Sequence, residues 1–256
     1  MKKFLFFDVD GTIYNSKKQL PDSAKRAILK AREQGHEIAI ATGRAPFMIQ
    51  DLLEELQIDT YITFNGQYVV YKGEVIFTDQ IPNETLQQIM HYGKERNHPF
   101  VFLNEKEMIA NASGYLEVEQ SLATLYYPYP AIDADYYLHT PVYQTLLFAK
   151  QEEQLLYEKA FPDVHFVRWH EYSCDMLPMG GSKSRGIEKL LAHIDFPMEQ
   201  TVAFGDGLND IEMLSTAGYS VAMGNGHEKA KAVATMVAKH VDEDGLYEAM
   251  KEIGLL

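Results

Sequence analysis

Phe4-Leu5-Phe6-Phe7-Asp8-Val9-Asp10-Gly11-Thr12 is the stretch from which the fold of this chain can be predicted. Four large apolar residues in succession indicate a strand that is buried on both faces. The strand ends abruptly on Asp8 and Asp10, whose side chains point to the same side if the chain is still extended there. Two carboxylates at the end of a buried strand repel each other, which favours a cation between them. A simple turn explains Asp10-Gly11 but not Asp8, so we predict a functional carboxylate pair.

Buried strands alternate with helices before and after a dissimilar middle segment. The apolar spacing indicates helices over 24–34, 45–56, 182–194, 208–217, 228–235 and 244–253, and strands over 37–41, 61–64, 201–204 and 219–223. Such alternation implies right-handed crossovers between neighbouring strands. It therefore predicts an α/β fold with a parallel sheet and helices on both faces.

Residues 82–180 break this rhythm. Its short apolar segments, 100–102, 108–110 and 143–148, alternate with polar ones instead of forming long runs, which is typical of antiparallel strands with one solvated face. Two helical stretches, 83–97 and 151–161, would cover the other face. We therefore predict an α+β domain over 82–180, inserted into a first domain made of 1–81 and 181–256.

Four of the predicted strands end on a polar residue, namely Asp8, Thr42, Asn65 and Asp206, and several of these residues adjoin glycine. In open α/β sheets, ligands bind outside the carboxyl ends of the strands. One such strand end is easily a simple turn, but four of them predict a shared site at this edge of the sheet.

A second acidic cluster, Gly205-Asp206-Gly207-Leu208-Asn209-Asp210, follows one of these strands and opens a helix. Taken alone it could be a helix N-cap with an acidic first turn. Together with Asp8 and Asp10 it brings three or four carboxylates to neighbouring strand ends. Oxygen ligands without cysteine or paired histidines suggest Mg²⁺.

Two cations lie close to these motifs in the sequence. Lys183 begins a helix, where the helix dipole disfavours a positive charge, so we predict that it holds phosphate or pairs with the carboxylates rather than lying exposed. Arg44, after Thr42-Gly43, is either an ordinary helix-start residue or reaches an anionic substrate, and the sequence leaves both possibilities open.

Length, charge and cysteine content narrow the function classes. A chain of 256 residues is long enough for two domains. The formal charge of −14 argues against a nucleic-acid partner, which needs a basic footprint. Cys174, the single cysteine, fits a reducing compartment. No apolar run is long enough for a signal peptide or a membrane span, so we predict a cytoplasmic protein without a membrane partner.

Several other site motifs are missing from the sequence. Its glycines complete neither a P-loop nor a G-x-G-x-x-G fingerprint, and its histidines do not form H-E-x-x-H. No G-x-S-x-G nucleophile motif occurs. Dinucleotide binding, zinc-protease chemistry and a serine nucleophile are therefore unsupported.

Four segments follow one another along the chain: Asp8-Val9-Asp10-Gly11-Thr12, Thr42-Gly43, Lys183 and the Gly205–Asp210 cluster. In this order they closely resemble the four motifs of the haloacid dehalogenase (HAD) superfamily. Asn65-Gly66 and the long insert between Thr42 and Lys183 resemble its Cof-type sugar-phosphatase branch, subclass IIB. The resemblance implies a Rossmann-like HAD core, with residues 82–180 as an inserted cap domain of the C2B type.

The resemblance also implies a role for each matching residue. Asp8 would be the nucleophile that forms an aspartyl-phosphate, and Asp10 the general acid and then the base. The phosphate-binding residues would be Val9, Thr42, Gly43, Lys183 and Asn209, and the substrate-binding residues Arg44 and Asn65. Mg²⁺ would bind the carboxylates of Asp8 and Asp206 and the backbone carbonyl of Asp10, with Asp210 in support.

We therefore predict a Mg²⁺-dependent phosphatase, a phosphoric monoester hydrolase that acts on small, sugar-phosphate-like metabolites as a monomer or homodimer. One alternative is a sugar phosphotransferase or phosphomutase of the same fold, which would transfer the phosphoryl group to a sugar hydroxyl instead of water. A second alternative is a regulator that binds a metabolite without turnover.

Overall fold

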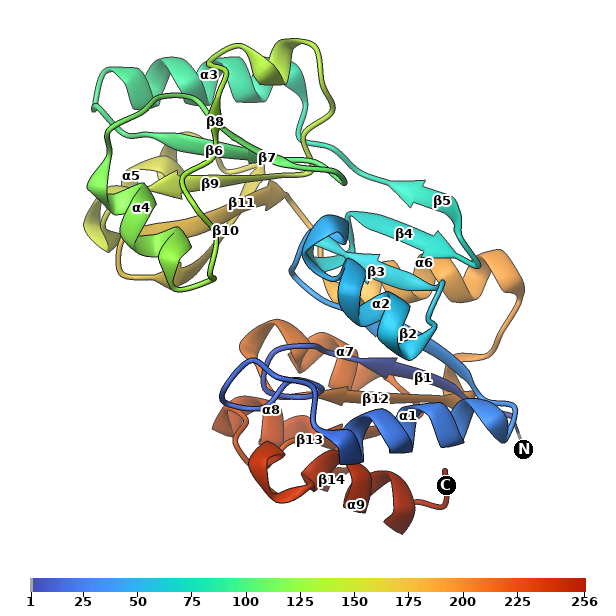
Figure 1. Cartoon of the computed structure of the whole chain (residues 1–256). Coiled ribbons are helices and arrows are strands. Elements are labelled where there is room, and N and C mark those ends of the chain that lie inside the picture. The colour runs from blue at the N-terminus through green and yellow to red at the C-terminus, as the bar shows by residue number, and fades with distance from the viewer. Residues whose placement is uncertain (1) are drawn as a thin grey trace. The chain divides into compact units, whose positions relative to one another are not determined.

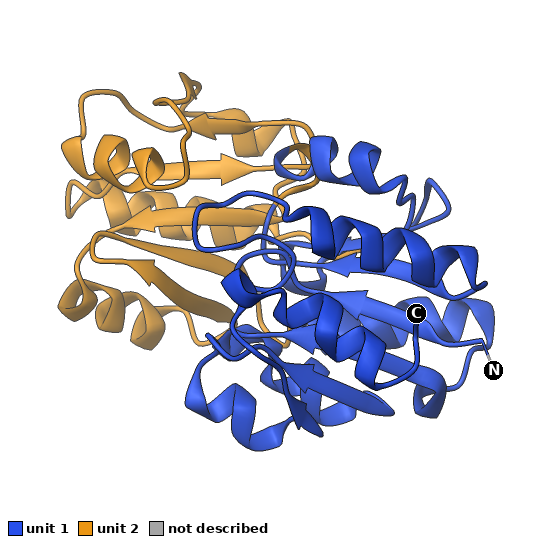
Figure 2. Cartoon of the chain, turned by 60° about the horizontal axis from the view of Figure 1, so that its bottom comes forward, with its two compact units in different colours: residues 1–44, 48–77, 182–256 blue, residues 45–47, 78–181 orange. Residues whose placement is uncertain are grey.

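The chain forms two compact units in a computed structural model that describes residues 2–256 (Figure 1). Unit 1 consists of Met1–Arg44, Met48–Phe77 and Ser182–Leu256, and unit 2 of Ala45–Phe47 and Thr78–Gly181 (Figure 2). Unit 2 is thus built from one long insertion, together with a short segment in which Phe47 packs edge-on against Tyr127.

Unit 1 contains an eight-stranded sheet in the order β14-β13-β12-β1-β2-β3-β4-β5. Its strands are β1 (Phe4–Phe7), β2 (Glu37–Ala41), β3 (Tyr61–Thr63), β4 (Tyr68–Tyr71), β5 (Glu74–Thr78), β12 (Thr201–Gly205), β13 (Tyr219–Ala222) and β14 (Met236–Val237). β1 pairs in parallel with both β12 and β2, and all four of its residues are fully buried. The predicted parallel sheet is confirmed, with β1 in its interior.

The strands at one edge of this sheet differ from the prediction of a wholly parallel arrangement. β4 pairs antiparallel with β3, and the two-residue turn Lys72-Gly73 leads from β4 to β5. Both turn residues have positive φ, 50° and 81°, as a type I′ hairpin turn requires. The predicted third strand ends at Asn65-Gly66, and the sequence does not predict this extension.

Helices cover both faces of the sheet, as predicted. Leu5 and Phe7 share a core with α1 (Asp22–Glu33), α2 (Gln50–Leu56) and α9 (Gly245–Glu252). Phe4 and Phe6 share another with α6 (Lys183–Ile194), α7 (Ile211–Thr216) and α8 (Glu228–Val233). Alternate side chains of β1 therefore enter opposite layers, which explains why its sequence is apolar without interruption.

Two predicted helices are each divided into a 3₁₀ turn and a shorter α-helix. Residues 45–56 form a 3₁₀ turn at Pro46–Met48 followed by α2, because Ile49 (φ −120°, ψ 8°) interrupts the helical backbone. Residues 208–217 divide into a 3₁₀ turn at Leu208–Asp210 and α7. In that turn Asp210 accepts hydrogen bonds from the preceding backbone amides, which ties the turn to the end of β12.

Unit 2 contains a six-stranded sheet in the order β10-β11-β9-β6-β7-β8. Its elements are α3 (Asn83–Lys94), β6 (Phe100–Leu103), β7 (Met108–Ala110), α4 (Leu116–Ala123), β8 (Ala131–Ile132), β9 (Gln144–Phe148), α5 (Gln151–Ala160), β10 (Val164–His170) and β11 (Ser173–Pro178). The pairs from β10 to β7 are antiparallel, as expected, whereas β7 and β8 are parallel. α4, β8, β10 and β11 are additions to the predicted elements.

One face of this second sheet packs against two helices. Phe100, Phe102 and Leu147 share a buried core with α3 and α5. The opposite face of the same strands carries polar side chains, among them Gln144 and Asp175.

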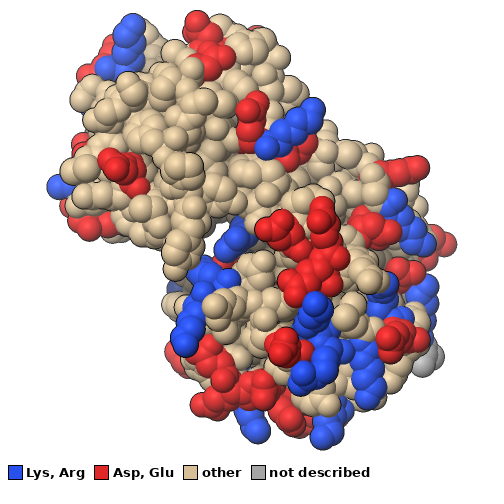
Figure 3. Space-filling view, viewed as in Figure 1, with Lys and Arg blue, Asp and Glu red and all other residues tan. Residues whose placement is uncertain are grey.

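The surface in Figure 3 carries acidic and basic side chains interspersed with each other. The charges on the face shown are concentrated over unit 1, and the visible part of unit 2 is largely uncharged. Within residues 2–256, the helices are too short or too polar for any of them to cross a membrane.

Candidate active site

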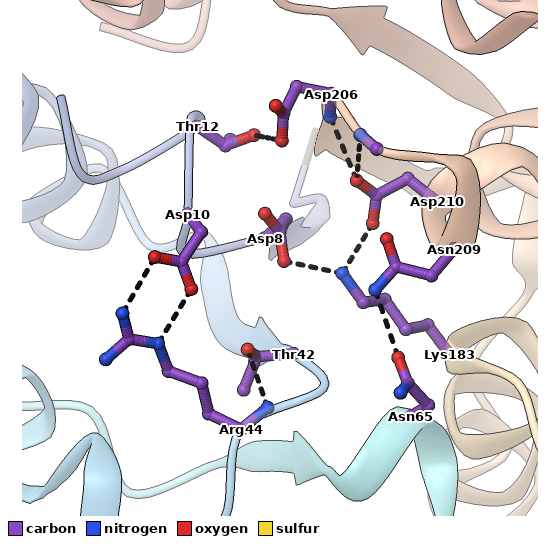
Figure 4. Close-up of polar contacts among 11 residues, drawn as sticks. Asp8, Asp10, Thr12, Thr42, Arg44, Asn65, Lys183, Asp206, Asn209 and Asp210 are labelled. Atoms are coloured by element: carbon purple, nitrogen blue, oxygen red, sulfur yellow. Dashed lines mark hydrogen bonds and ion pairs between the residues drawn. The ribbon is translucent and has the colours of Figure 1, made fainter. Parts of the chain in front are cut away.

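The strand ends of unit 1 bring the predicted residues together. Phe7 lies opposite Phe204 of β12 and Ile40 of β2, so the residues that follow these strands meet at one edge. The backbone amide of Asp8 donates to the carbonyl of Phe204 (2.9 Å). The register of the strands therefore sets where each following polar residue lies, and these residues come together at one edge of the sheet (Figure 4).

Three carboxylates form the centre of this edge. Asp8, Asp206 and Asp210 each place an oxygen within 4.8 Å of the other two. Asp210 is fully buried, and its Oδ2 accepts from the amides of Asp206 (2.9 Å) and Gly207 (2.8 Å). Gly11 leaves room for this group, because a Cβ there would lie 2.4 Å from Oδ2 of Asp206.

Lys183 lies between two of these carboxylates. Ser182 caps α6 by accepting from the amide of Arg185, and Lys183 is the first residue of that helix. Its Nζ donates to Oδ1 of Asp8 (2.5 Å) and to Oδ1 of Asp210 (2.6 Å), and the side chain has no solvent exposure. Burial alone would lower the lysine pKa, but the charges of Asp210 and Asp8 raise it above its ordinary value. Lys183 therefore stays protonated.

The acidic cluster fits a hard divalent cation. Burial raises the pKa of Asp8 well above its usual range, with repulsion from Asp210 and Asp206 adding to the shift while Lys183 opposes it. Burial and the charge of Asp210 raise the pKa of Asp206 to about 6. One lysine thus does not neutralise three carboxylates, and their oxygen donors are the ligands that Mg²⁺ prefers.

Asp10 lies apart from this cluster and faces two cations. Arg44 grips its carboxylate with two hydrogen bonds, from Nε and from one terminal nitrogen, each 2.7 Å long, and Lys18 adds a third of 2.6 Å. Burial would raise the pKa of Asp10, but the hydrogen bonds and charge of Arg44, helped by Lys18, lower it to about 2. The Arg44 side chain thus reaches a carboxylate of the protein itself, and its contact with an anionic substrate stays a prediction.

We expect the Arg44–Asp10 pair to stabilise the folded protein in a pH-dependent way. The pKa of Asp10 is lower in the folded state than in the unfolded chain, so the pair stabilises the fold above about pH 4, and this contribution is lost as pH falls toward 2. Because the Asp10 side chain is 35% exposed, solvent screening limits the effect to about 1 kcal/mol.

Urea unfolding of wild type and Arg44→Gln in the presence of EDTA would measure the contribution of this pair to stability at each pH. The difference in unfolding free energy should shrink between pH 6 and pH 3.5. A constant difference over that range would mean that Arg44 stabilises the fold through its other contacts. Arg26→Gln, a change of another arginine of unit 1, serves as the matched control.

The remaining predicted residues line the same edge. The hydroxyl of Thr42 accepts from the amide of Arg44 (3.2 Å), and the side chain of Asn209 donates to that of Asn65 (3.0 Å). Asn65 is buried with φ 50°, and a Cβ on Gly43 would lie 3.0 Å from its amide nitrogen. The carbonyl of Val9 accepts from the amides of the turn that follows, including that of Tyr14 (2.8 Å).

Three further residues join the site without having been singled out from the sequence. The Thr12 hydroxyl donates to Asp206 (3.3 Å), and Asn225 donates to the carbonyl of Gly11 (2.8 Å). Lys18, with φ 58°, reaches Asp10 from a short loop. Asn225 was detectable, because Gly224-Asn225-Gly226 follows β13 as the other polar residues follow their strands. Lys18 has no such signal, since its loop precedes α1.

Comparison with known proteins identifies the family. A model of the haloacid dehalogenase-like hydrolases matches residues 5–250. The chain is 42% identical over 254 residues to YkrA of Bacillus subtilis, which is named as a phosphatase, with 99% of this chain and 98% of that protein covered.

Two solved structures have the same fold over the whole chain. BT1666 of Bacteroides thetaiotaomicron, described among HAD phosphatases, has a TM-score of 0.92 at 29% identity, covering 100% of this chain and 96% of its own. The HAD subclass IIB sugar phosphatase BT4131 has a TM-score of 0.86 at 31% identity, with both chains fully covered. The predicted subclass and the class of phosphoric monoester hydrolase are confirmed. By the match of nearly its entire length, this chain belongs to the haloacid dehalogenase-like hydrolase family.

Proposed function

We propose that this hydrolase is a Mg²⁺-dependent phosphatase that cleaves small, sugar-phosphate-like metabolites through a phosphorylated Asp8. The observation that carries the proposal is the buried amine of Lys183 between Asp8 and Asp210. It holds Asp8 in place and brings positive charge to the point where phosphoryl oxygens would gather. Phosphoryl transfer depends mainly on such positioning and charge neutralisation.

Asp8 acts as the nucleophile in this proposal. Its carboxylate oxygen bonds to phosphorus while the bond from phosphorus to the leaving oxygen breaks, and water then attacks the phosphorus, releasing phosphate and restoring Asp8. The phosphoryl oxygens are bound by the hydroxyl of Thr42, the amine of Lys183, the amides of Val9 and Gly43 and the side chain of Asn209. Arg44 and Asn65 contact the substrate.

Mg²⁺ would be held by the carboxylates of Asp8 and Asp206 and by the carbonyl of Asp10, with Asp210 in support. When bound, the ion supplies the positive charge that lets a phosphate dianion approach a carboxylate. The support for this is the excess of carboxylates over cations in the cluster.

Asp10 handles the protons in both steps. With a pKa of about 2 it is ionised at neutral pH while Arg44 and Lys18 hold it, so it is a weak base in this state, because a general base works best with a pKa near the operating pH. Protonating the leaving group first requires a protonated Asp10. We infer that these two cations release Asp10 when substrate is bound.

Phosphate release in the presence and absence of metal tests the proposed function. Sugar phosphates, nucleotides and cofactor phosphates are incubated with the protein in Mg²⁺ and in excess EDTA. We expect Mg²⁺-dependent release of inorganic phosphate from a few of these compounds and its loss in EDTA. Transfer to an added sugar without release would indicate the phosphotransferase alternative. Binding without release or transfer, by protein shown to be folded, would indicate a regulator.

The remaining assignments follow from the same proposal. Residues 82–180 are a cap domain of the C2B type inserted into a core of 1–81 and 181–256, and Mg²⁺ is the physiological metal. The protein works in the cytoplasm as a monomer or homodimer, on a small molecule rather than a nucleic acid. The charge of −14 supports a partner other than nucleic acid, and the single buried Cys174 supports a reducing compartment.

A further inference from the structure

An asparagine between two glycines, Asn225, lies at the edge of the sheet that carries the three carboxylates of the candidate site. The strands β1, β12 and β13 are neighbours in the sheet of unit 1 (Figure 1). Gly205 at the end of β12 lies opposite Ala222 at the end of β13. The loop Gly224-Asn225-Gly226 therefore leaves the sheet at the edge where the carboxylates gather. Asn225 and the residues that it contacts all belong to unit 1.

The hydrogen bonds of Asn225 fix the orientation of its side-chain amide. Its Oδ1 accepts from the backbone amide of Val241 (2.9 Å), and its Nδ2 donates to the backbone carbonyl of Gly11 (2.8 Å). Because a backbone N–H only donates and a carbonyl only accepts, exchanging the oxygen and the nitrogen would break both bonds. The same Nδ2 lies 3.5 Å from Oδ2 of Asp206. The amide thus offers its two N–H groups to a carbonyl and to a carboxylate.

These two acceptors belong to different strand ends that approach each other closely. Gly11 follows the aspartates after β1, and Asp206 follows β12. A Cβ on Gly11 would lie 2.4 Å from Oδ2 of Asp206 and 3.1 Å from Nδ2 of Asn225. The loop after β13 also holds the backbone of Asp206, because the amide of His227 donates to its carbonyl (2.8 Å). Asn225 therefore lies where the loops after three neighbouring strands meet.

A donor between these acceptors keeps them at a defined distance. The carbonyl of Gly11 and the carboxylate of Asp206 both carry negative charge on oxygen, so without a donor between them they repel each other. The hydroxyl of Thr12 donates to Oδ1, the other oxygen of Asp206 (3.3 Å; Figure 4). Each oxygen of this carboxylate thus has a donor of its own, and the two donors come from different loops.

The spacing of these groups matters for a hard cation. The carboxylates of Asp8 and Asp206 lie on opposite sides of this contact, and an oxygen of each is within 4.8 Å of the other. Mg²⁺ requires nearly ideal octahedral geometry, with ligand distances of about 2.0–2.1 Å. Groups that orient the ligating carboxylates therefore contribute to the affinity for the ion, although they do not touch it.

We propose that Asn225 is a positioning residue of the metal site. Its amide sets the spacing between the loop that carries Asp8 and Asp10 and the carboxylate of Asp206, and through that spacing the affinity for Mg²⁺. Asn225 is not itself a ligand, because its side-chain oxygen accepts from Val241. The inference rests on the metal dependence of the proposed function.

Calorimetric titration with Mg²⁺ tests this role in wild type, Asn225→Leu and Asn225→Ala. We expect the Kd for Mg²⁺ to rise at least about tenfold in both variants, the usual effect of losing a group that orients metal ligands. In assays of phosphate release, the Mg²⁺ concentration for half-maximal rate should rise by a similar factor. The value of kcat at saturating Mg²⁺ should change much less, because the bound ion itself draws its ligands together.

A matched control separates this role from a contribution to folding alone. Both Asn225 variants leave the amide of Val241 without its partner, so we expect them to unfold at lower urea concentration in EDTA. Thr235 accepts from the amide of Ser220 near the start of β13 (3.2 Å). Thr235→Val therefore weakens the same strand away from the carboxylates, and it should keep the wild-type Kd for Mg²⁺. If Asn225 served folding alone, its variants would also keep that Kd.

The possible outcomes distinguish the positioning role from the phosphatase function. A wild-type Kd for Mg²⁺ in folded Asn225→Leu and Asn225→Ala would overturn the positioning role, even if phosphate release by wild type depends on Mg²⁺. Weaker Mg²⁺ binding by both variants, together with no phosphate release by wild type, would support the positioning role and overturn the phosphatase function. Absence of Mg²⁺ binding by wild type would overturn both.

Discussion

Asp8→Asn should abolish phosphate release, with a fall in kcat of at least about a thousandfold. An amide cannot attack phosphorus as a carboxylate does, and no other carboxylate of the cluster can replace it. Asp210 is engaged with the amides of Asp206 and Gly207 and with Lys183. The substitution is nearly isosteric, and Lys183 keeps its contact with Asp210, so we expect the fold to be retained.

The covalent step itself can be trapped. Wild-type protein is mixed with substrate and quenched in acid, and the acyl phosphate is reduced with borohydride, which converts a phosphorylated aspartate to homoserine. Mass spectrometry should find homoserine at position 8 in wild type and not in Asp8→Asn. Asp51→Asn, an exposed acid on α2, should retain full activity. Undiminished turnover by Asp8→Asn would rule out the covalent route.

The N-terminal strand and the site edge could be predicted from the sequence because they obey short-range rules. Phe4–Phe7 is apolar throughout since both faces are covered, and the residues after β1, β2 and β12 are polar because a parallel sheet exposes its strand ends together. The contact of Lys183 with Asp8 was one of two predicted possibilities. It follows from a cation at a helix start, where only a carboxylate or phosphate partner makes the position favourable.

The pairing of Asp10 with Arg44 and Lys18 could not be predicted in the same way. It depends on the path of the loop after Gly11 and on side-chain rotamers, and neither leaves a periodic signal. The edge strands β4 and β5 were missed because the 3₁₀ turn Phe64–Gly66, with Asn65 at φ 50°, reverses the chain within three residues. The elements of unit 2 were predicted least completely, because the short strand β8 and the mixed sequence of β10 show no clean alternation of apolar and polar residues.

Lys183→Met should show how strongly the acidic cluster depends on its one buried cation. Removing one partner of a buried charge pair costs about 3–5 kcal/mol, because the remaining charges are left uncompensated. We expect a loss of this size in the free energy of unfolding, measured with urea at pH 7.5 in EDTA. Lys189→Met, an exposed position on the same helix, should cost no more than about 0.5 kcal/mol.

Lower pH and added Mg²⁺ distinguish the loss of charge from the loss of packing in Lys183→Met. A carboxylate whose pKa is raised in the folded state destabilises the fold, fully so above the folded pKa. This penalty begins to shrink as pH falls through the folded value and is gone below the unfolded pKa of about 4. The pKa of Asp206 is about 6 and that of Asp8 is also raised, so the cost of Lys183→Met should decrease between pH 7.5 and pH 5. Saturating Mg²⁺ should reduce it as well, because the ion replaces the missing positive charge. If the cost is the same at both pH values and with Mg²⁺, the lysine stabilises unit 1 through the packing of its aliphatic chain, and the cluster does not require a cation.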